Sequence, residues 1–286
     1  MMHDWPLVFF TVLTQTAIGT LCVATVFGLM LGRNSGADER FHLMRRPLLA
    51  ASGLSVLGLA LSFLHLGYPL NAINAIRNIS TSWMAREIVL TSAFIGATCL
   101  TTFLAMRQRR VANLHLIVCA ALGIANLLVM AEIYRHTSVA TWLPVNTHFA
   151  FIGTALTGGS LVAWLCVAPA ASQQDARQFG IVAMLCVVAA ILLQLLALPL
   201  FISELNQVAA NPVVTFPLRS LTAYAQLGDM RCVRWALSIV GGALFCLAMW
   251  RLRDDTRKPM GTIVSAAALL ACGELVGRYL FYAVYG

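Results

Sequence analysis

Four ionisable residues lie in or beside long apolar segments of the chain, where charge is costly. His65 ends one such segment, Glu87 begins the next, and Glu274 and Arg278 stand four positions apart in the last. Ionisable groups in such segments usually face a protein interior and often carry function. Histidine, with an unperturbed pKa of about 6.5, accepts a proton near neutral pH, and a neighbouring carboxylate can relay it. The four residues therefore indicate proton-transfer chemistry.

Oxidation of a lipid-soluble hydroquinone is one reaction that fits these residues. It releases two electrons and two protons, so it needs an apolar slot, hydrogen-bond partners for two hydroxyls and bases that pass protons to water. A structural interpretation competes with it. The i,i+4 spacing of Glu274 and Arg278 favours an ion pair on one helix face. His65 could bond a loop carbonyl, and Glu87 could interact with a helix dipole.

The elements that must position these residues are transmembrane helices. Hydrophobic residues make up 60% of the chain and charged residues only 10%, against about 25% charged residues in soluble domains. A helix needs about 20 apolar residues to cross a bilayer. Continuous apolarity, without alternation, argues against a membrane barrel. We predict an all-α integral membrane protein, a single domain over residues 1–286, with eight spans: Pro6–Leu31, Pro47–Leu66, Glu87–Met106, Val111–Tyr134, His148–Val167, Gly180–Leu200, Cys232–Trp250 and Thr262–Tyr282.

The basic residues predict the orientation of these helices. Five arginines fall on the side of the N-terminus: Arg77, Arg86, Arg135, Arg219 and Arg231. Twelve basic residues fall on the other side: Arg33, Arg40, Arg45, Arg46, Arg107, Arg109, Arg110, Arg177, Arg251, Arg253, Arg257 and Lys258. The positive-inside rule then puts both termini outside the cytoplasm. All six tyrosines lie toward that side, as in an interfacial aromatic belt. The first apolar run is too long for a cleaved signal peptide.

Two long loops, Gly67–Arg86 and Phe201–Arg231, lie on the outer side and predict that a partner docks there.

Cysteines and histidines give no pattern for a resident redox centre. No C-x-x-C pair occurs among the eight cysteines, whereas iron–sulfur clusters are bound by cysteines at short spacings. His65 and His148 form the one conceivable axial pair for a haem, with no other support. We expect no haem, no cluster, no metal and no nucleic-acid binding.

Short motifs carry a resemblance to a known family. Four segments resemble motifs of DmsC, the membrane anchor of dimethyl sulfoxide reductase. The first two are His3–Val12, which is similar to H-E-W-P-L-x-x-F-T-V, and His65–Leu70, which is similar to H-L-G-S-P. The others are Glu87–Ile88, which matches N-E-I or R-E-I, and Gly273–Arg278 with Phe281–Tyr282, which is similar to G-E-L-I-G-R-x-x-F-Y. Asn74 falls where that family has an asparagine. The matches keep their order from residue 3 to residue 282.

The resemblance implies an eight-helix anchor with periplasmic termini that binds and oxidises menaquinol and carries no haem. Its partners would be a four-cluster iron–sulfur subunit and a molybdopterin catalytic subunit on the periplasmic face. His65 and Glu87 would take the quinol-site roles, with Arg86, Asn74, Glu274 and Arg278 as further candidates for quinol binding. The sequence leaves open whether Arg86 contacts quinol, Glu87 or lipid, and which acceptor the partner reduces.

Two alternatives remain. A purely structural anchor would leave quinol to another subunit. A small transporter would show inverted repeats or helices broken at mid-membrane, but we find no convincing repeat, and the ionisable residues gather near one face. The same one-sided placement predicts electroneutral electron delivery rather than proton pumping.

Overall fold

The computed structural model describes residues 5–31, 36–64, 74, 76–210, 220–252 and 259–283. These residues form helices joined by turns, with no strand among them. The helices are α1 (Trp5–Met30), α2 (Ala37–Phe63), the short 3₁₀-helix η2 (Ile76–Asn78), α4 (Trp83–Gln108), α5 (Asn113–Arg135), α6 (Asn146–Val167), α7 (Gln173–Leu196), α8 (Leu198–Ala210), α9 (Ser220–Gln226), α10 (Gly228–Arg251) and α11 (Met260–Ala283).

Eight spans within the described residues are long and apolar enough to cross a membrane, which confirms the predicted helical fold and number. One of them, Gln173–Gln207, joins α7 to α8. The predicted loop over Phe201–Arg231 is wrong in this respect, because it contains most of α8 and all of α9. The helical hydrogen bond from the Phe201 amide to the Ala197 carbonyl carries the helix past the apolar run.

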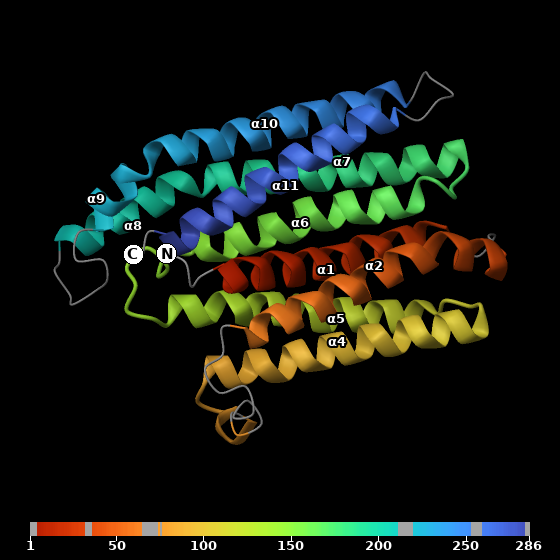
Figure 1. Cartoon of the computed structure of the whole chain (residues 1–286), viewed down its shortest axis with the longest axis horizontal. Helices are drawn as coiled ribbons and strands as arrows, with labels where there is room; N and C mark the ends of the chain where they lie inside the picture. The colour runs from red at the N-terminus through yellow and green to blue at the C-terminus, as the bar shows by residue number, and fades with distance from the viewer. Residues whose placement is uncertain are drawn as a thin grey trace.

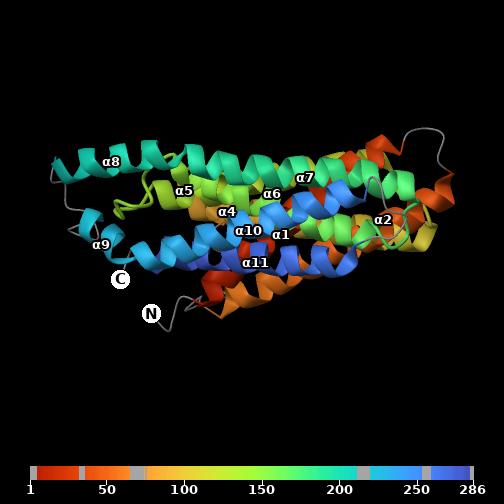
Figure 2. The same ribbon diagram turned by 90° about the horizontal axis from the view of Figure 1, so that it is seen from above.

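Two sets of four helices pack side by side (Figure 1). In the first, each of α1, α2, α4 and α5 contacts the next, and α5 returns to α1. In the second, α6, α7, α10 and α11 repeat this order of contacts, and α11 returns to α6. The two sets meet mainly where α1 packs against α6, and the view from above shows the same lengthwise alignment of the helices (Figure 2).

Glycine allows the backbones of α1 and α6 to touch. A Cβ atom on Gly19 would lie 1.8 Å from the Ala155 carbonyl oxygen, and one on Gly159 would lie 2.2 Å from the Gly19 carbonyl carbon. Small residues permit such close approach between membrane helices. The two halves are therefore joined through direct backbone packing.

Helix α1 begins and α11 finishes at the same end of the bundle, here named the termini end (Figure 1). The Trp5 ring stacks on Tyr279 there, with centroids 5.4 Å apart. At the opposite end, the basic end, α1, α4, α6 and α10 finish and α2, α5, α7 and α11 begin (Figure 1). The described arginines at or beside these helix ends are Arg40, Arg45, Arg46, Arg107, Arg109, Arg110, Arg177 and Arg251. The structure thus sorts charge between the two ends as the sequence predicted.

Candidate functional site

Of the two residues predicted to handle quinol protons, Glu87 lies within the described part of the chain. His65 lies outside the described residues and follows Leu64, which caps α2. Glu87 is half-buried in the second turn of α4, a helix capped by the Ser82 hydroxyl, which accepts a bond from the Ala85 amide at 3.3 Å. No described residue forms a hydrogen bond or ion pair with Glu87.

Arg86 holds the connection that precedes α4. Its Nε donates to the Ile79 carbonyl at 2.9 Å and its Nη2 to the Ser80 carbonyl at 2.6 Å. The guanidinium also lies over the Trp83 ring, 4.3 Å from the centroid. These contacts fasten the start of the helix that carries Glu87. Asn74, the other predicted neighbour, is exposed.

A buried pair of tyrosines lies near Glu87. The Tyr134 and Tyr282 hydroxyls are 2.7 Å apart, joining α5 to α11. Both phenols lie within electrostatic reach of Glu87 and of Arg278. At 8% and 5% exposed they face the protein interior, so these two residues are not part of the predicted interfacial aromatic belt.

Glu274 and Arg278 are buried, at 6% and 3% exposed, but the predicted direct ion pair is absent between them. The Thr154 hydroxyl stands between the two charges. It donates to Glu274 Oε2 at 2.6 Å and accepts from Arg278 Nη2 at 3.2 Å. Arg278 also donates to Gln15 Oε1 at 2.5 Å. Gln15 of α1 and Thr154 of α6, which sequence spacing could not place, form these hydrogen bonds in place of a direct ion pair.

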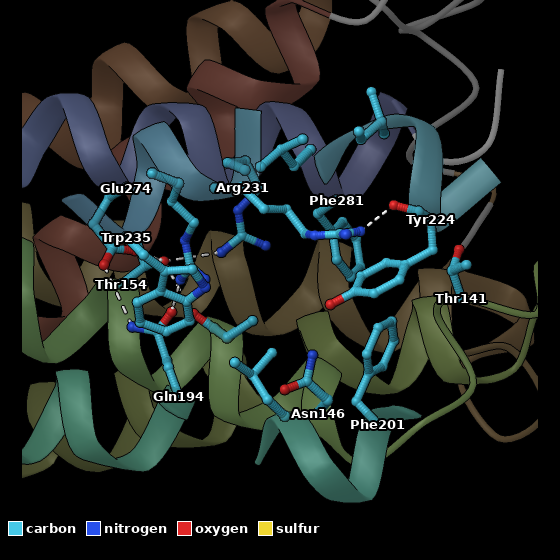
Figure 3. A pocket seen from close by; sticks show the side chains of 17 residues that line it. Thr141, Asn146, Thr154, Gln194, Phe201, Tyr224, Arg231, Trp235, Glu274 and Phe281 are labelled. Atoms are coloured by element: carbon cyan, nitrogen blue, oxygen red, sulfur yellow. Dashed lines mark hydrogen bonds between the residues drawn. The ribbon is translucent and has the colours of Figure 1, made fainter. Parts of the chain in front are cut away.

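Around Glu274 and Arg278 the structure forms a pocket of about 110 Å³ at the termini end, lined by both charged and apolar side chains (Figure 3). Nothing in the sequence indicated that Gln194 and Arg234 would lie here, although both stand out as polar groups in apolar helices. Arg234 donates to Gln194 Oε1, and Gln194 Nε2 donates to Glu274 Oε1 at 3.4 Å. Glu87 is not among the described residues that line it. The described members of the predicted site thus divide between two places, with Glu87 apart from Glu274 and Arg278.

His148, the conceivable haem partner of His65, is engaged elsewhere. Its Nε2 lies 2.9 Å from Glu132 Oε1, and Arg135 and His136 also contact that carboxylate. This cluster fastens the start of α6 to the end of α5. In the described ranges, no group of three or more His, Cys, Asp or Glu side chains could hold a metal ion.

Comparison with known proteins decides the family. The model of the DMSO reductase anchor subunit, DmsC, matches residues 1–284. The chain belongs to the DmsC family. It is 28% identical to the anaerobic dimethyl sulfoxide reductase chain YnfH of Escherichia coli and 27% identical to the anaerobic dimethyl sulfoxide reductase C subunit of Haemophilus influenzae, over 99% of this sequence and 95% of each relative. No solved structure matches it.

Membership confirms the resemblance that the motifs indicated. As a DmsC-family protein with eight candidate spans, the chain is a multi-pass protein of the bacterial inner membrane that anchors a DMSO reductase complex. Such a complex supplies catalytic and iron–sulfur subunits as its partners.

Proposed function

We propose that this DmsC-family protein oxidises menaquinol beside Glu87 and His65 and passes the electrons to the iron–sulfur subunit of its complex. The observation that carries the proposal is the Glu87 carboxylate, half-buried near the termini end of a membrane helix and without a described partner. A carboxylate in that setting is costly unless it binds something. A hydroquinone hydroxyl would supply the missing hydrogen bond.

Packing supports the pairing of His65 with Glu87. Helix α2 ends next to His65, α4 begins just before Glu87, and the two helices contact each other. Arg86 fastens the intervening connection, so we assign it a positioning role. Asn74 belongs to the same connection and is exposed, available to the ring or to a partner. Glu274 and Arg278 lie in the other pocket, and we leave them out of the quinol-oxidising centre.

In this scheme the termini end faces the periplasm. The two electrons of each menaquinol leave through a four-cluster iron–sulfur subunit to a molybdopterin subunit docked there. The two protons pass from His65 and Glu87 to periplasmic water, because both residues belong to that end. Turnover is therefore electroneutral. Release of protons into the cytoplasm during turnover would contradict this part of the proposal.

Binding of a quinol-site inhibitor tests the site against a purely structural anchor. We expect the assembled complex in membranes to bind such an inhibitor in equimolar amount, and Glu87→Lys to weaken binding at least tenfold. Glu39→Lys, an exposed position at the basic end, is the matched control. An assembled wild-type complex that binds no inhibitor would favour a structural anchor.

A further inference from the structure

The pocket around Glu274 carries more positive charge than its protein partners balance. Three arginines line it, namely Arg231, Arg234 and Arg278, and Glu274 is the sole carboxylate among the described lining residues. None of the three guanidinium groups makes an ion pair with a described carboxylate within 4.0 Å. We call this site the arginine pocket.

Several guanidinium donors in the pocket also lack acceptors. Arg278 is 3% exposed, yet its Nε and Nη1 have no hydrogen-bond partner, and Arg234 Nε has none either. A buried donor left unpaired destabilises the protein, and more so when it is charged. A buried charge without a counter-charge is costlier still. Both deficits are removed by an anion with several acceptor oxygens, and arginine binds phosphate in this way.

An apolar cavity adjoins the arginine pocket. It has a volume of about 270 Å³ and shares Thr154 and Glu274 with the pocket. Its other lining residues are almost all apolar and come from α1, α6 and α11, among them Phe9, Leu13 and Leu161. A polar compartment that joins an apolar one fits an amphiphile with an anionic head and a hydrocarbon tail.

We propose that the arginine pocket binds the phosphodiester head group of an anionic membrane lipid, with one acyl chain in the apolar cavity between α1, α6 and α11. Arg234 and Arg278 contribute the unpaired donors, and Arg231 lies at the pocket beside Tyr224 (Figure 3). The lipid wedges the two four-helix sets together, because the cavity lies between α1 of one set and α6 and α11 of the other. The inference does not depend on the quinol-oxidising centre.

Native mass spectrometry of the full-length protein, purified with its partner subunits in mild detergent, tests this site. Phosphatidylglycerol, phosphatidylcholine and inorganic phosphate are added separately as probes. We expect wild type to retain at least five times more phosphatidylglycerol than phosphatidylcholine. Arg234→Gln should retain at least ten times less phosphatidylglycerol than wild type. Arg234→Lys keeps part of that retention. Arg251→Gln, exposed at the other end of the same helix α10, behaves as wild type.

A thermal measurement guards against misfolding of a variant. Phosphatidylglycerol should raise the melting temperature of wild type and of Arg251→Gln, but not that of Arg234→Gln. Equal retention of phosphatidylglycerol by wild type and Arg234→Gln would overturn the proposal, as would equal retention of the two lipids. Binding of inorganic phosphate without any lipid, or loss of a co-purified quinone in place of a lipid, would overturn the lipid as the ligand.

Discussion

The Tyr134 hydroxyl lies 2.7 Å from the Tyr282 hydroxyl, across 148 positions of sequence. This bond ties the last helix of the first four-helix set to the last helix of the second. It also places two phenols within electrostatic reach of both Glu87 and Arg278. The two groups of predicted site residues are thus separate but adjoin one buried polar pair.

Removing one hydroxyl from this pair should destabilise the fold. We expect Tyr134→Phe and Tyr282→Phe each to lower the free energy of unfolding by about 1 kcal/mol, the net value of a typical hydrogen bond. The double variant should lose little more than either single one, since the bond is already gone. Thermal unfolding in detergent measures these effects. Tyr224→Phe, whose hydroxyl bonds no described residue, is the control, and fully additive losses in the double variant would refute the coupling.

The contact between α1 and α6 predicts a strong effect of a single methyl group. An added Cβ at Gly19 meets the Ala155 carbonyl oxygen at 1.8 Å, so Gly19→Ala must push the helices apart. We expect a destabilisation of about 3 kcal/mol, at the upper end for overpacked interiors. Gly96→Ala in α4 meets nothing within 4 Å and should be neutral or stabilising by up to about 1 kcal/mol. Equal melting temperatures for the two variants would be inconsistent with this packing.

Thr154 should matter far more than its neighbour Thr157. Thr154→Val removes one hydrogen bond to Glu274 and one to Arg278. It should lower the free energy of unfolding by about 1–3 kcal/mol, because it removes partners of two charged groups. Thr157, one turn along α6, has a buried hydroxyl with no described partner. Thr157→Val should therefore be neutral or stabilising. Unfolding of the two isosteric variants side by side gives the comparison, and a costlier Thr157→Val would contradict it.

The charge sorting predicts which end faces the periplasm. Basic residues concentrate on cytoplasmic loops, so alkaline phosphatase fused after the last residue should be active. The same enzyme inserted at Ala170, in the turn between α6 and α7 at the basic end, should be inactive. Activities of the opposite pattern would invert the proposed orientation.

The helices were predictable because apolar runs of about 20 residues have one stable solution in a bilayer. The residues at which the helices begin and end were less predictable. The charged stretch before Pro47 did not show that α2 begins at Ala37, because charged side chains are allowed once a helix leaves the hydrocarbon. Helices α8 and α9 lie in the stretch predicted as the loop Phe201–Arg231, because hydropathy does not tell a helix beyond the apolar run from a loop.

The candidate site was predictable in part for a related reason. Charge inside an apolar run singled out Glu87, Glu274 and Arg278. Which helices face one another is a tertiary property, so the spacing of Glu274 and Arg278 suggested an ion pair where Thr154 actually intervenes. Gln194 offered a usable signal, the one amide in the predicted span Gly180–Leu200, but nothing in the sequence linked it to α11.

Menaquinol-driven reduction of dimethyl sulfoxide by the assembled complex tests the central claim most directly. His65→Arg and Glu87→Lys should each lower the quinol-driven rate at least tenfold, while reduction driven by an artificial donor to the catalytic subunit stays unchanged. The same substitutions at exposed basic-end positions, His115→Arg and Glu39→Lys, should leave both rates unchanged. Normal quinol-driven turnover in His65→Arg or Glu87→Lys would contradict the assignment of quinol oxidation to this site.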